Sequence, residues 1–566
     1  MKLISTNEAK CRDCYKCVRS CPVKSICIKS GNTKTQLSAQ VIEDICIHDG
    51  LCTMVCPQKA KVVVNNVYDV KQLLLEKVVP VLASVAPSFP VMLPLSDPAV
   101  FPSLLKQLGF SYVGQTAVGA ELICAEHRQV SPPGPLISSA CPVVVNLVER
   151  HYPHLIPYLS PLVSPMVAHG RFLKNQFPGS VVVFIGPCIA KKGEDTGGAV
   201  DYVLGFKEVW EWIEHEGIDL GQFSPAEFDG YQPGPARLFP TEGGQLKATS
   251  LGTDLLDKDI QTVTGINNCI ELFKNFNTAV PSRRPLFMEL MACNGGCLGG
   301  PYGVSHGDIY SKKTALLSYY SPKVKKPPGI RKQLSLPPVL LYRAYQNRRT
   351  VVTDPTAEQI KSILALTDKF SPEDELNCGA CGFDSCREKA AAVFQGNAES
   401  QMCIPYMRKR AESISNLVLR ALPDGVVIFD EDFIIREINL AANTMFDCDS
   451  RVIGEKIDVL VNPAGFESVF LEGKTIKIDA GELPNGKITR QIVFPLENSA
   501  VAIFTDITNE LKQREDLLLV KAETIDRAQE VIKKQMTVSQ VIAGLLGETA
   551  AETKVQLSQL IKLMKE

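Results

Sequence analysis

The middle of the chain alternates between short apolar runs and amphipathic stretches. The run SVVVFIG (180–186) predicts a strand that leads into a turn, and DYVLGFKEVWEWIEHEGI (201–218) predicts a strand followed by a helix. Strands that alternate with helices in this way are typical of α/β domains. We therefore predict an α/β domain over residues 67–320.

The last third of the chain has a different pattern. ISNLVLRALPDGVVIFDEDFIIREIN (414–439) predicts a helix and two strands, and three further alternations predict strands at 474–480, 489–496 and 500–508. From residue 509 onward, apolar residues recur every three or four positions among charged ones. This spacing predicts a signalling helix or a short coiled coil, and a helix packed on its own domain is the alternative.

Size and charge restrict the classes of function. With 566 residues the chain is long enough for three to five domains, and a net charge of −2 gives no bulk argument for binding nucleic acid or a membrane. The N-terminus lacks an apolar signal core, and four prolines interrupt the most apolar run, residues 78–95. We therefore expect a cytoplasmic protein.

Nineteen cysteines are the unusual feature of the composition. In a long cytosolic chain they indicate metal ligands rather than disulfides, and fifteen of them fall into three groups. The first group, CRDCYKCVRSCP and later CIHDGLCTMVCP, has the C-x2-C-x2-C-x3-C-P spacing of two-cluster ferredoxins, which residues 1–66 resemble. A zinc-binding module is the alternative. The resemblance implies two [4Fe-4S] clusters, one held by Cys11, Cys14, Cys17 and Cys56 and the other by Cys21, Cys46 and Cys52.

Asp49 stands where the second ferredoxin run would have its second cysteine. A carboxylate is a harder ligand than a thiolate. Asp49 therefore either binds the fourth iron of the second cluster or leaves that iron open, and a [3Fe-4S] cluster is the third alternative.

The second group of cysteines lies on three loops, each at the end of an apolar run: SSACP, GPCIAKKGED and MELMACNGGCLGGP. In α/β folds, ligands bind in loops beyond the strand ends. The glycines of CNGGC permit a close approach of the backbone to a bulky cofactor. The candidates to hold one cubane, a [4Fe-4S] cluster, are Cys141, Cys188, Cys293 and Cys297.

The three loops and their flanks resemble the signature loops of the iron-only (FeFe) hydrogenases, in the same order, over roughly residues 78–305. In that family a cubane is bridged through one cysteine to a two-iron centre with carbon monoxide and cyanide ligands, and the whole is called the H-cluster. The resemblance implies that Cys297 is the bridging ligand, that Lys191 hydrogen-bonds a cyanide, and that Met291 packs against the two-iron centre. It also implies H2 and protons as substrates, a redox partner protein and separate maturation proteins. A domain that binds only a cubane, or no metal, is the alternative.

Two departures from the family pattern concern this site. The first loop usually has two adjacent cysteines, the first of which passes protons to the site. Here that position is Ala140, whose methyl group carries no proton. The second loop usually has methionine where Gly186 stands, whereas Glu194, which matches a glutamate on the family's proton route, is retained. Retained ligands with an interrupted proton route resemble the sensory branch of the family.

The third group, Cys378, Cys381, Cys386 and Cys403, has C-x2-C-x4-C-x16-C spacing. The intervening EKAAAVFQGNAE predicts a helix. This segment resembles a cubane-binding iron–sulfur domain with the same glycine pattern, and zinc is the alternative because it also binds four cysteines. Residues 321–350 are basic and proline-rich, which predicts a linker rather than a nucleic-acid-binding tail.

Residues 411–508 resemble a PAS sensor domain in the LPDGV entry, the helix start INLAA and the terminal DIT. Because no histidine follows residue 306, a histidine-ligated haem is excluded for this domain, and the identity of any PAS ligand stays open. The PAS segment and the last helix are candidates for a homodimer interface. Four cysteines fit none of the three groups and are interpreted as packed thiols: Cys27, Cys124, Cys269 and Cys448. For Cys448, ligation of a haem or attachment of a flavin is the alternative.

The predicted fold class is a multidomain α/β and α+β chain. Its predicted parts are a ferredoxin-like βαβ module (1–66), an α/β iron-only-hydrogenase core (67–320), a linker (321–350), a small helical iron–sulfur domain (351–410), an α+β PAS domain (411–508) and a C-terminal signalling helix or coiled coil (509–566). We expect a hydrogen or redox sensor with low turnover, whose cubanes relay electrons and whose PAS domain passes the signal to a separate kinase or phosphatase. The alternatives are an active iron-only hydrogenase and an electron-transfer protein that holds cubanes only.

Overall fold

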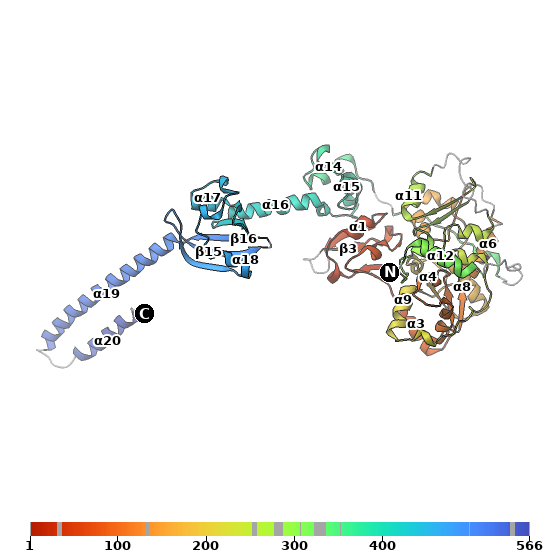
Figure 1. Cartoon of the computed structure of the whole chain (residues 1–566), viewed down its shortest axis with the longest axis horizontal. Coiled ribbons are helices and arrows are strands. Elements are labelled where there is room, and N and C mark those ends of the chain that lie inside the picture. The colour runs from red at the N-terminus through yellow and green to blue at the C-terminus, as the bar shows by residue number, and fades with distance from the viewer. Residues whose placement is uncertain are drawn as a thin grey trace. The chain divides into compact units, whose positions relative to one another are not determined.

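The structure is a computed structural model (Figure 1). It divides into two compact units, Met1–Tyr406 and Met407–Glu566, and each is described by itself. The residues that the structure describes are 2–30, 37–127, 129–130, 135–251, 257–276, 287–305, 307–321, 336–350, 353–496, 498–543 and 550–564.

The first unit begins with a ferredoxin-like segment of two short antiparallel ladders and two short helices. Each helix starts inside one of the two cysteine runs. The residues that precede the helices, Tyr15 and Gly50, have φ of 58° and 78°, so the chain turns sharply into each helix. The elements are β1 (Ile4–Thr6) paired with β4 (Lys61–Val63), β2 (Ile26–Ser30) paired with β3 (Leu37–Val41), α1 (Lys16–Ser20) and α2 (Leu51–Val55).

A four-stranded parallel sheet forms the centre of the first unit and confirms the predicted α/β core. Its strand order is β6-β5-β8-β9, and every residue of β5 is buried. The strand and helix predicted over 201–218 are β9 and α9. The strands are β5 (Val81–Val85), β6 (Tyr112–Gln115), β8 (Val181–Gly186) and β9 (Tyr202–Gly205), and the helices that pack on them are α5 (Phe101–Gln107), α8 (Pro165–Gln176) and α9 (Phe206–His215).

A second, three-stranded parallel sheet with the order β10-β11-β7 completes the core. Its strands are β7 (Leu136–Ile137), β10 (Ile260–Thr264) and β11 (Phe287–Met291). The three cysteine loops follow β7, β8 and β11, so each loop leaves the carboxyl end of a parallel strand. The other helices of the core are α3 (Val67–Glu76), α4 (Phe89–Met92), α6 (Ala117–His127), α7 (Pro142–His151), α10 (Gly244–Thr249), α11 (Ile266–Lys274) and α12 (Ile309–Tyr320).

The described part of the proline-rich stretch, residues 336–350, packs against the core. Leu341 is 3% exposed, and its carbonyl accepts a hydrogen bond from Val163 at 2.8 Å. The Tyr345 hydroxyl donates to the carbonyl of Leu162 at 2.9 Å. The basic stretch that precedes this part, residues 322–335, lies outside the described residues.

A small helical segment follows, with α14 (Ala357–Ala365) and α15 (Cys386–Phe394) packed together. The predicted helix EKAAAVFQGNAE ends earlier than the sequence indicates. It stops at Phe394, because Gly396 adopts a φ of 72° that terminates the helix. α16 (Ile404–Ala421) begins directly after the last cysteine of this segment and continues across the boundary into the second unit.

The second unit contains a five-stranded antiparallel sheet with the order β13-β12-β16-β15-β14, as predicted for the PAS segment. Phe429, Phe466 and Phe504 are fully buried in its core. A 36-residue helix, α19 (Thr508–Ala543), follows and contacts α20 (Ala550–Leu563). The helix was predicted, and the coiled coil stays a prediction. The other elements are β12 (Gly425–Asp430), β13 (Ile435–Ile438), α17 (Leu440–Phe446), α18 (Glu467–Glu472), β14 (Ile476–Glu482), β15 (Ile488–Leu496) and β16 (Ser499–Asp506).

Within the described ranges, none of the helices is both long enough and apolar enough to cross a membrane.

Candidate functional site

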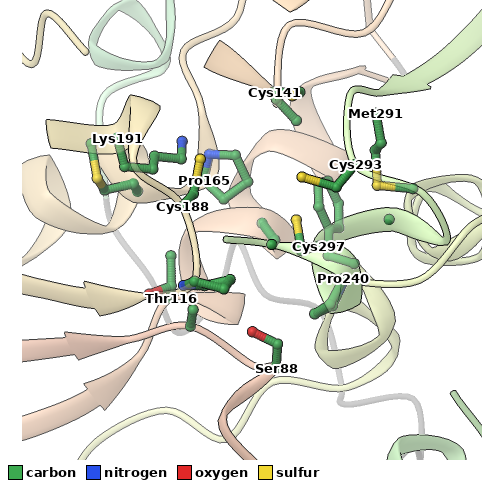
Figure 2. Close-up of a pocket in the computed structure, with 18 of the residues that line it drawn as sticks. Ser88, Thr116, Cys141, Pro165, Cys188, Lys191, Pro240, Met291, Cys293 and Cys297 are labelled. Atoms are coloured by element: carbon green, nitrogen blue, oxygen red, sulfur yellow. The ribbon is translucent and has the colours of Figure 1, made fainter. Parts of the chain in front are cut away.

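A cavity of about 110 Å³ lies where the carboxyl ends of the two parallel sheets face each other. All four cysteines of the second group line it. Figure 2 shows the sulfur atoms of Cys188, Cys293 and Cys297 directed toward the space between them. The structure therefore brings together four cysteines from distant parts of the sequence. The first, Cys141, and the last, Cys297, are 156 positions apart.

Local geometry fixes each cysteine loop. Pro142 opens α7, so Cys141 stands at the N-cap between a strand and a helix. The backbone geometry also requires the two glycines of CNGGC. Gly295 and Gly296 have φ of 68° and 80°, and a Cβ at Gly296 would collide with the carbonyl of Pro240. The backbone between the last two cysteines is therefore possible only with glycine.

The chemistry of the donors suits an iron–sulfur cluster. Burial raises the pKa of the Cys188 thiol to about 11 and that of Cys297 to about 12, and it raises the pKa of Cys293 as well. Without a metal these thiols are therefore neutral at pH 7. Iron that replaces the thiol protons converts them to thiolates with a compensating positive charge, as metal binding to cysteine requires.

Lys191 is the cationic side chain of the cavity wall, and Glu194 lies behind it. The Lys191 Nζ donates to Glu194 Oε2 at 2.7 Å, and the two side chains are 10% and 4% exposed. Arg343 lies 4.0 Å from the other oxygen of the same carboxylate. Glu194 thus lies outside the described cavity lining, and its contacts orient Lys191 rather than reach the cavity.

Ala140 and Met291 also line the cavity. Gly186 stands where the hydrogenase family usually has methionine. A Cβ at Gly186 would lie 2.6 Å from the ring of Phe184, which itself lines the cavity. Phe184 therefore occupies the space beside residue 186, and a side chain at residue 186 would require this ring to move.

The ferredoxin-like cysteines lie in two groups of electrostatic neighbours. Electrostatic interactions link Cys17 with three other cysteines, and they link Cys52 with two cysteines and Asp49. The two sets are therefore Cys11, Cys14, Cys17 and Cys56, and Cys21, Cys46, Asp49 and Cys52.

Asp49 is partly buried within the second set. Its Oδ1 accepts a hydrogen bond from the backbone of Leu51 at 3.2 Å, whereas Oδ2 is buried without a hydrogen-bond partner. Burial raises the pKa of the Asp49 carboxyl to about 6. An unpartnered carboxylate oxygen among three buried cysteines fits a ligand for the fourth iron, because coordination would supply the missing partner.

The third group of cysteines lines a smaller cavity of about 30 Å³. Two lysines that the sequence analysis did not single out lie beside it. The Lys369 Nζ donates to the sulfur of Cys403 at 3.3 Å, and Lys389 lines the cavity while its Nζ donates to the carbonyl of Ser400 at 2.7 Å. The members of the group are Cys378, Cys381, Cys386 and Cys403.

The four groups of candidate ligands lie next to one another within the first unit. Tyr15, beside the first ferredoxin set, interacts electrostatically with Cys381, and Arg19 donates to the carbonyl of Ala380 at 3.4 Å. On the other side of the ferredoxin-like segment, Asp49 interacts electrostatically with Cys293. The order is therefore third group, first ferredoxin set, second ferredoxin set and central cavity.

The remaining cysteines are packed thiols in agreement with their interpretation. Cys27, Cys124 and Cys269 are at most 2% exposed, and Cys448 is half-buried. Among the described residues, no three histidine, cysteine or acidic side chains are placed to hold a single metal ion.

Comparison with known families gives a counterpart to four segments of the chain. Residues 79–301 match the family model for the iron only hydrogenase large subunit, C-terminal domain. Residues 10–60 match the 4Fe-4S dicluster domain, residues 374–405 match an Fe-S cluster domain, and residues 414–478 match a PAS domain. The chain is an iron–sulfur protein that combines these four domains, and its central domain is of the iron-only hydrogenase type.

Individual relatives are distant and partial. The chain is 25% identical over 397 residues to the NADP-reducing hydrogenase subunit HndD of Solidesulfovibrio fructosivorans, covering 56% of this chain and 67% of that one. It is 24% identical to iron hydrogenase 1 of Clostridium pasteurianum, covering 35% of this chain and 44% of that relative. It is 36% identical over 164 residues to the cytosolic Fe-S cluster assembly factor NAR1 of Yarrowia lipolytica, covering 25% of this chain and 33% of that one.

Among solved structures, a variant of the [FeFe]-hydrogenase HydA1 from Chlamydomonas reinhardtii matches with a TM-score of 0.39 and 20% identity, over 50% of this chain and 99% of that one. The PAS domain of nitrogen regulation protein NR(II) from Vibrio parahaemolyticus matches with a TM-score of 0.16 and 16% identity, over 16% of this chain and 97% of that domain.

Proposed function

We propose that the chain senses hydrogen or redox state at an H-cluster, turns hydrogen over slowly, and passes the signal through its PAS domain to a separate output protein. The observation that carries the proposal is the composition of the central cavity. Its wall keeps four cysteines and Lys191 but has Ala140 where a proton-carrying group would stand. The metal-binding chemistry is thus retained while one means of proton transfer is removed.

The side chains of the cavity have distinct roles in this proposal. Cys141, Cys188, Cys293 and Cys297 would hold the cubane, with Cys297 bridging to the two-iron centre. When bound, the H-cluster supplies the centre at which hydrogen is split or formed. Lys191, held by Glu194, would offer an ammonium donor to an anionic ligand. Phe184 and Met291 are apolar parts of the wall and would exclude water from the centre.

Electrons would leave through the ferredoxin-like segment and reach the third cluster. The order of the ligand sets supports this direction, because each set lies next to the following one. In this proposal Cys11, Cys14, Cys17 and Cys56 hold one cubane, Cys21, Cys46, Cys52 and Asp49 hold the second, and Cys378, Cys381, Cys386 and Cys403 hold the third.

The PAS domain would receive the signal through α16. Ile404 and Pro405, the first residues of α16, line the cavity of the third group. Near the other end of the helix, the carbonyl of Leu419 accepts a hydrogen bond at 2.9 Å from the side chain of Asn439, which caps α17. A single helix of 18 residues therefore connects Cys403 to the first residues of the PAS domain.

Two other functions have support of their own. The likeness to HndD and to iron hydrogenase 1 favours a hydrogenase with useful turnover, and the likeness to NAR1 favours a protein that holds cubanes without a two-iron centre. Ala140 argues against the first of these, since loss of one positioned proton-transfer group lowers rates about 10²–10⁴-fold. The retained cavity with Lys191 argues against the second.

Infrared spectroscopy distinguishes these functions. The chain is produced together with hydrogenase maturation proteins, and its spectrum is recorded under argon and under H2. The proposal predicts sharp carbon monoxide and cyanide bands that shift under H2, with slow turnover. Cys297→Ser is the control and should lose the bands while it keeps the ferredoxin-like clusters. Filled cubanes without such bands would support the protein that holds cubanes only. The bands together with fast turnover would support the active hydrogenase.

A further inference from the structure

Another cavity of the first unit lies where four segments of the chain meet. We call it the interdomain cavity; it has a volume of about 610 Å³, and its lining includes Lys24, Arg150, Arg349, Asp354, Glu388 and Gln395. These residues come from the ferredoxin-like segment, from α7, from the chain between the core and α14, and from α15 and its end. Small-molecule sites are often found between domains and have volumes of about 300–1,000 Å³. The interdomain cavity therefore has the position and the size of a ligand site.

Arg150, at the end of α7, is the buried cation of this cavity and is 7% exposed. Its Nη1 donates to the carbonyls of Glu43 and Cys46, the latter at 2.7 Å. Its Nε is also buried but has no hydrogen-bond partner among the residues that the structure describes. An arginine stays charged in proteins, and a buried donor on a charged group needs an acceptor. The guanidinium of Arg150 therefore lacks one acceptor in the lining of a cavity.

Two further cations line the same cavity. The backbone amide of Arg348 donates to the carbonyl of Glu149 at 2.9 Å, and this bond holds Arg349 beside the end of α7. In the ferredoxin-like segment, Lys24 lies 3.7 Å from Asp384, whose side chain is 83% exposed, so this ion pair is weak. Three cationic side chains from segments far apart in the sequence thus line one cavity.

Carboxylates compensate these cations only in part. Two of them line the cavity: Asp354 is exposed, and Glu388, which is also exposed, already accepts from a backbone amide at 3.0 Å. Glu43 and Asp44 attract Arg150 from outside the described lining, and Glu43 is paired with a histidine at 2.7 Å. A phosphate group has several acceptor oxygens and a negative charge. It would supply both the acceptor that the arginine Nε lacks and the missing charge.

We propose that the interdomain cavity binds a ligand that carries a phosphate group, with Arg150, Lys24 and Arg349 as its cationic contacts. The cavity has room for more than a phosphate ion, and apolar side chains such as Ile45 and Ala391 line another part of it. Because the lining joins the ferredoxin-like segment to α15, the bound ligand fixes the third group of cysteines against that segment. Binding changes no covalent bond and needs no H-cluster, so the proposal goes beyond the function proposed above.

Isothermal titration calorimetry of the full-length protein with its iron–sulfur clusters tests the binding. Inorganic phosphate and adenosine diphosphate are the two probes, each at constant ionic strength. At least one probe should bind to saturation. Lys24→Gln and Arg349→Gln should each weaken its binding about tenfold, because each removes one charge-assisted contact. Lys29→Gln is the matched control: it removes an exposed cation of β2 outside the described lining and should bind as the wild type does.

The two probes distinguish the sources of the phosphate group. Equal binding of both would show that free phosphate is sufficient, whereas tighter binding of adenosine diphosphate would show that the ligand is an organic phosphate. The proposal would be overturned if neither probe bound to the wild type. It would also be overturned if the wild type, Lys24→Gln and Arg349→Gln had equal affinities.

Hydrogen–deuterium exchange with mass spectrometry locates the site. The bound probe should slow the exchange of α15 and of residues 345–350, and Arg150→Gln should abolish this slowing. Because Arg150 also holds the loop of Cys46, the double variant Lys24→Gln/Arg349→Gln gives the same test while both contacts of Arg150 with that loop remain. Slowing confined to other segments, such as the PAS domain, would overturn the proposal. If the infrared bands of the H-cluster were absent, the proposed function would fail and these binding results would not change.

Discussion

Removal of the Lys369 charge should lower the reduction potential of the third cluster. The Lys369 ammonium donates to the sulfur of Cys403 at 3.3 Å, and its side chain is half-buried. A cluster gains one negative charge when it is reduced, so a nearby cation stabilises the reduced form. Lys369→Met removes that stabilisation, and the midpoint potential should therefore become more negative.

The size of the shift follows from Coulomb's law. With about 6 Å between the ammonium and the centre of the cluster and an effective dielectric constant of about 20, the interaction is about 2.8 kcal/mol. For a one-electron couple this corresponds to about 120 mV. Cys378 is exposed, so solvent reduces the interaction, and we expect a shift of about 50–120 mV for Lys369→Met.

Redox titration followed by electron paramagnetic resonance measures this potential. The signal of the third cluster is assigned by its loss in Cys378→Ser. Lys361→Met is the matched control, because Lys361 is exposed on α14 in the same segment. An unchanged potential in Lys369→Met, with the signal present, would show that the ammonium does not act on the cluster. A signal that is absent from the wild type would show that this site holds no cubane.

Three further predictions concern the centre, the second ferredoxin set and the core. Ala140→Cys should raise hydrogen turnover by up to about 10²–10⁴-fold in gas-exchange assays, and an unchanged rate in a protein with intact infrared bands would show that proton transfer at residue 140 is not limiting. Asp49→Cys should change the electron paramagnetic resonance spectrum of the ferredoxin-like segment and leave the infrared bands of the centre in place; an unaltered spectrum would remove Asp49 from the ligands. The third prediction concerns His169, which is 1% exposed and shares a hydrogen bond of 2.8 Å between its Nδ1 and the hydroxyl of Ser84. Burial lowers the pKa of His169 to about 3. In the unfolded chain this histidine takes up a proton at the usual pKa near 6.5, whereas in the folded chain it stays neutral down to about pH 3. The folded state is therefore not destabilised by His169 above pH 6.5, and its free energy of unfolding falls by about 1.4 kcal/mol per pH unit as the pH drops from 6.5 toward 3. Denaturant titration of metal-free protein, followed by the fluorescence of the two tryptophans on α9, should show this slope in the wild type and a shallower slope in His169→Asn; equal slopes would contradict the assignment.

Regular elements could be predicted from the sequence because their signals are local. The runs 180–186 and 201–218 became β8, β9 and α9, since the apolar periodicity of each run has the period of the element it forms. The cysteine sets also have local spacing. The end of α15 was placed too late, since the sequence does not state that Gly396 takes a positive φ.

Side chains that meet only in the folded chain were harder to predict. Lys369 precedes the first cysteine of its group by nine positions, and nothing in that spacing indicates its contact with Cys403. Glu289, which lines the central cavity, did give a signal, because it is a lone charge in the apolar run FMELM (287–291). A charge within a buried strand implies a partner or a function. Phe184 and Gly186 are two positions apart on one strand and share a face, so their contact could have been expected.

The absence of a thiol at residue 140 has different consequences for an enzyme and for a sensor. A proton-transfer group accelerates hydrogen splitting and hydrogen formation equally, so it changes the rate at which the clusters come to equilibrium with H2 but not the equilibrium itself. An enzyme depends on the rate, whereas a sensor depends on the fraction of its clusters that is reduced. The fraction of the third cluster reduced at a given H2 pressure should therefore be the same in the wild type and in Ala140→Cys, and only the time needed to reach it should differ. A shift of the equilibrium fraction would mean that residue 140 acts on the potential of the centre rather than on proton transfer.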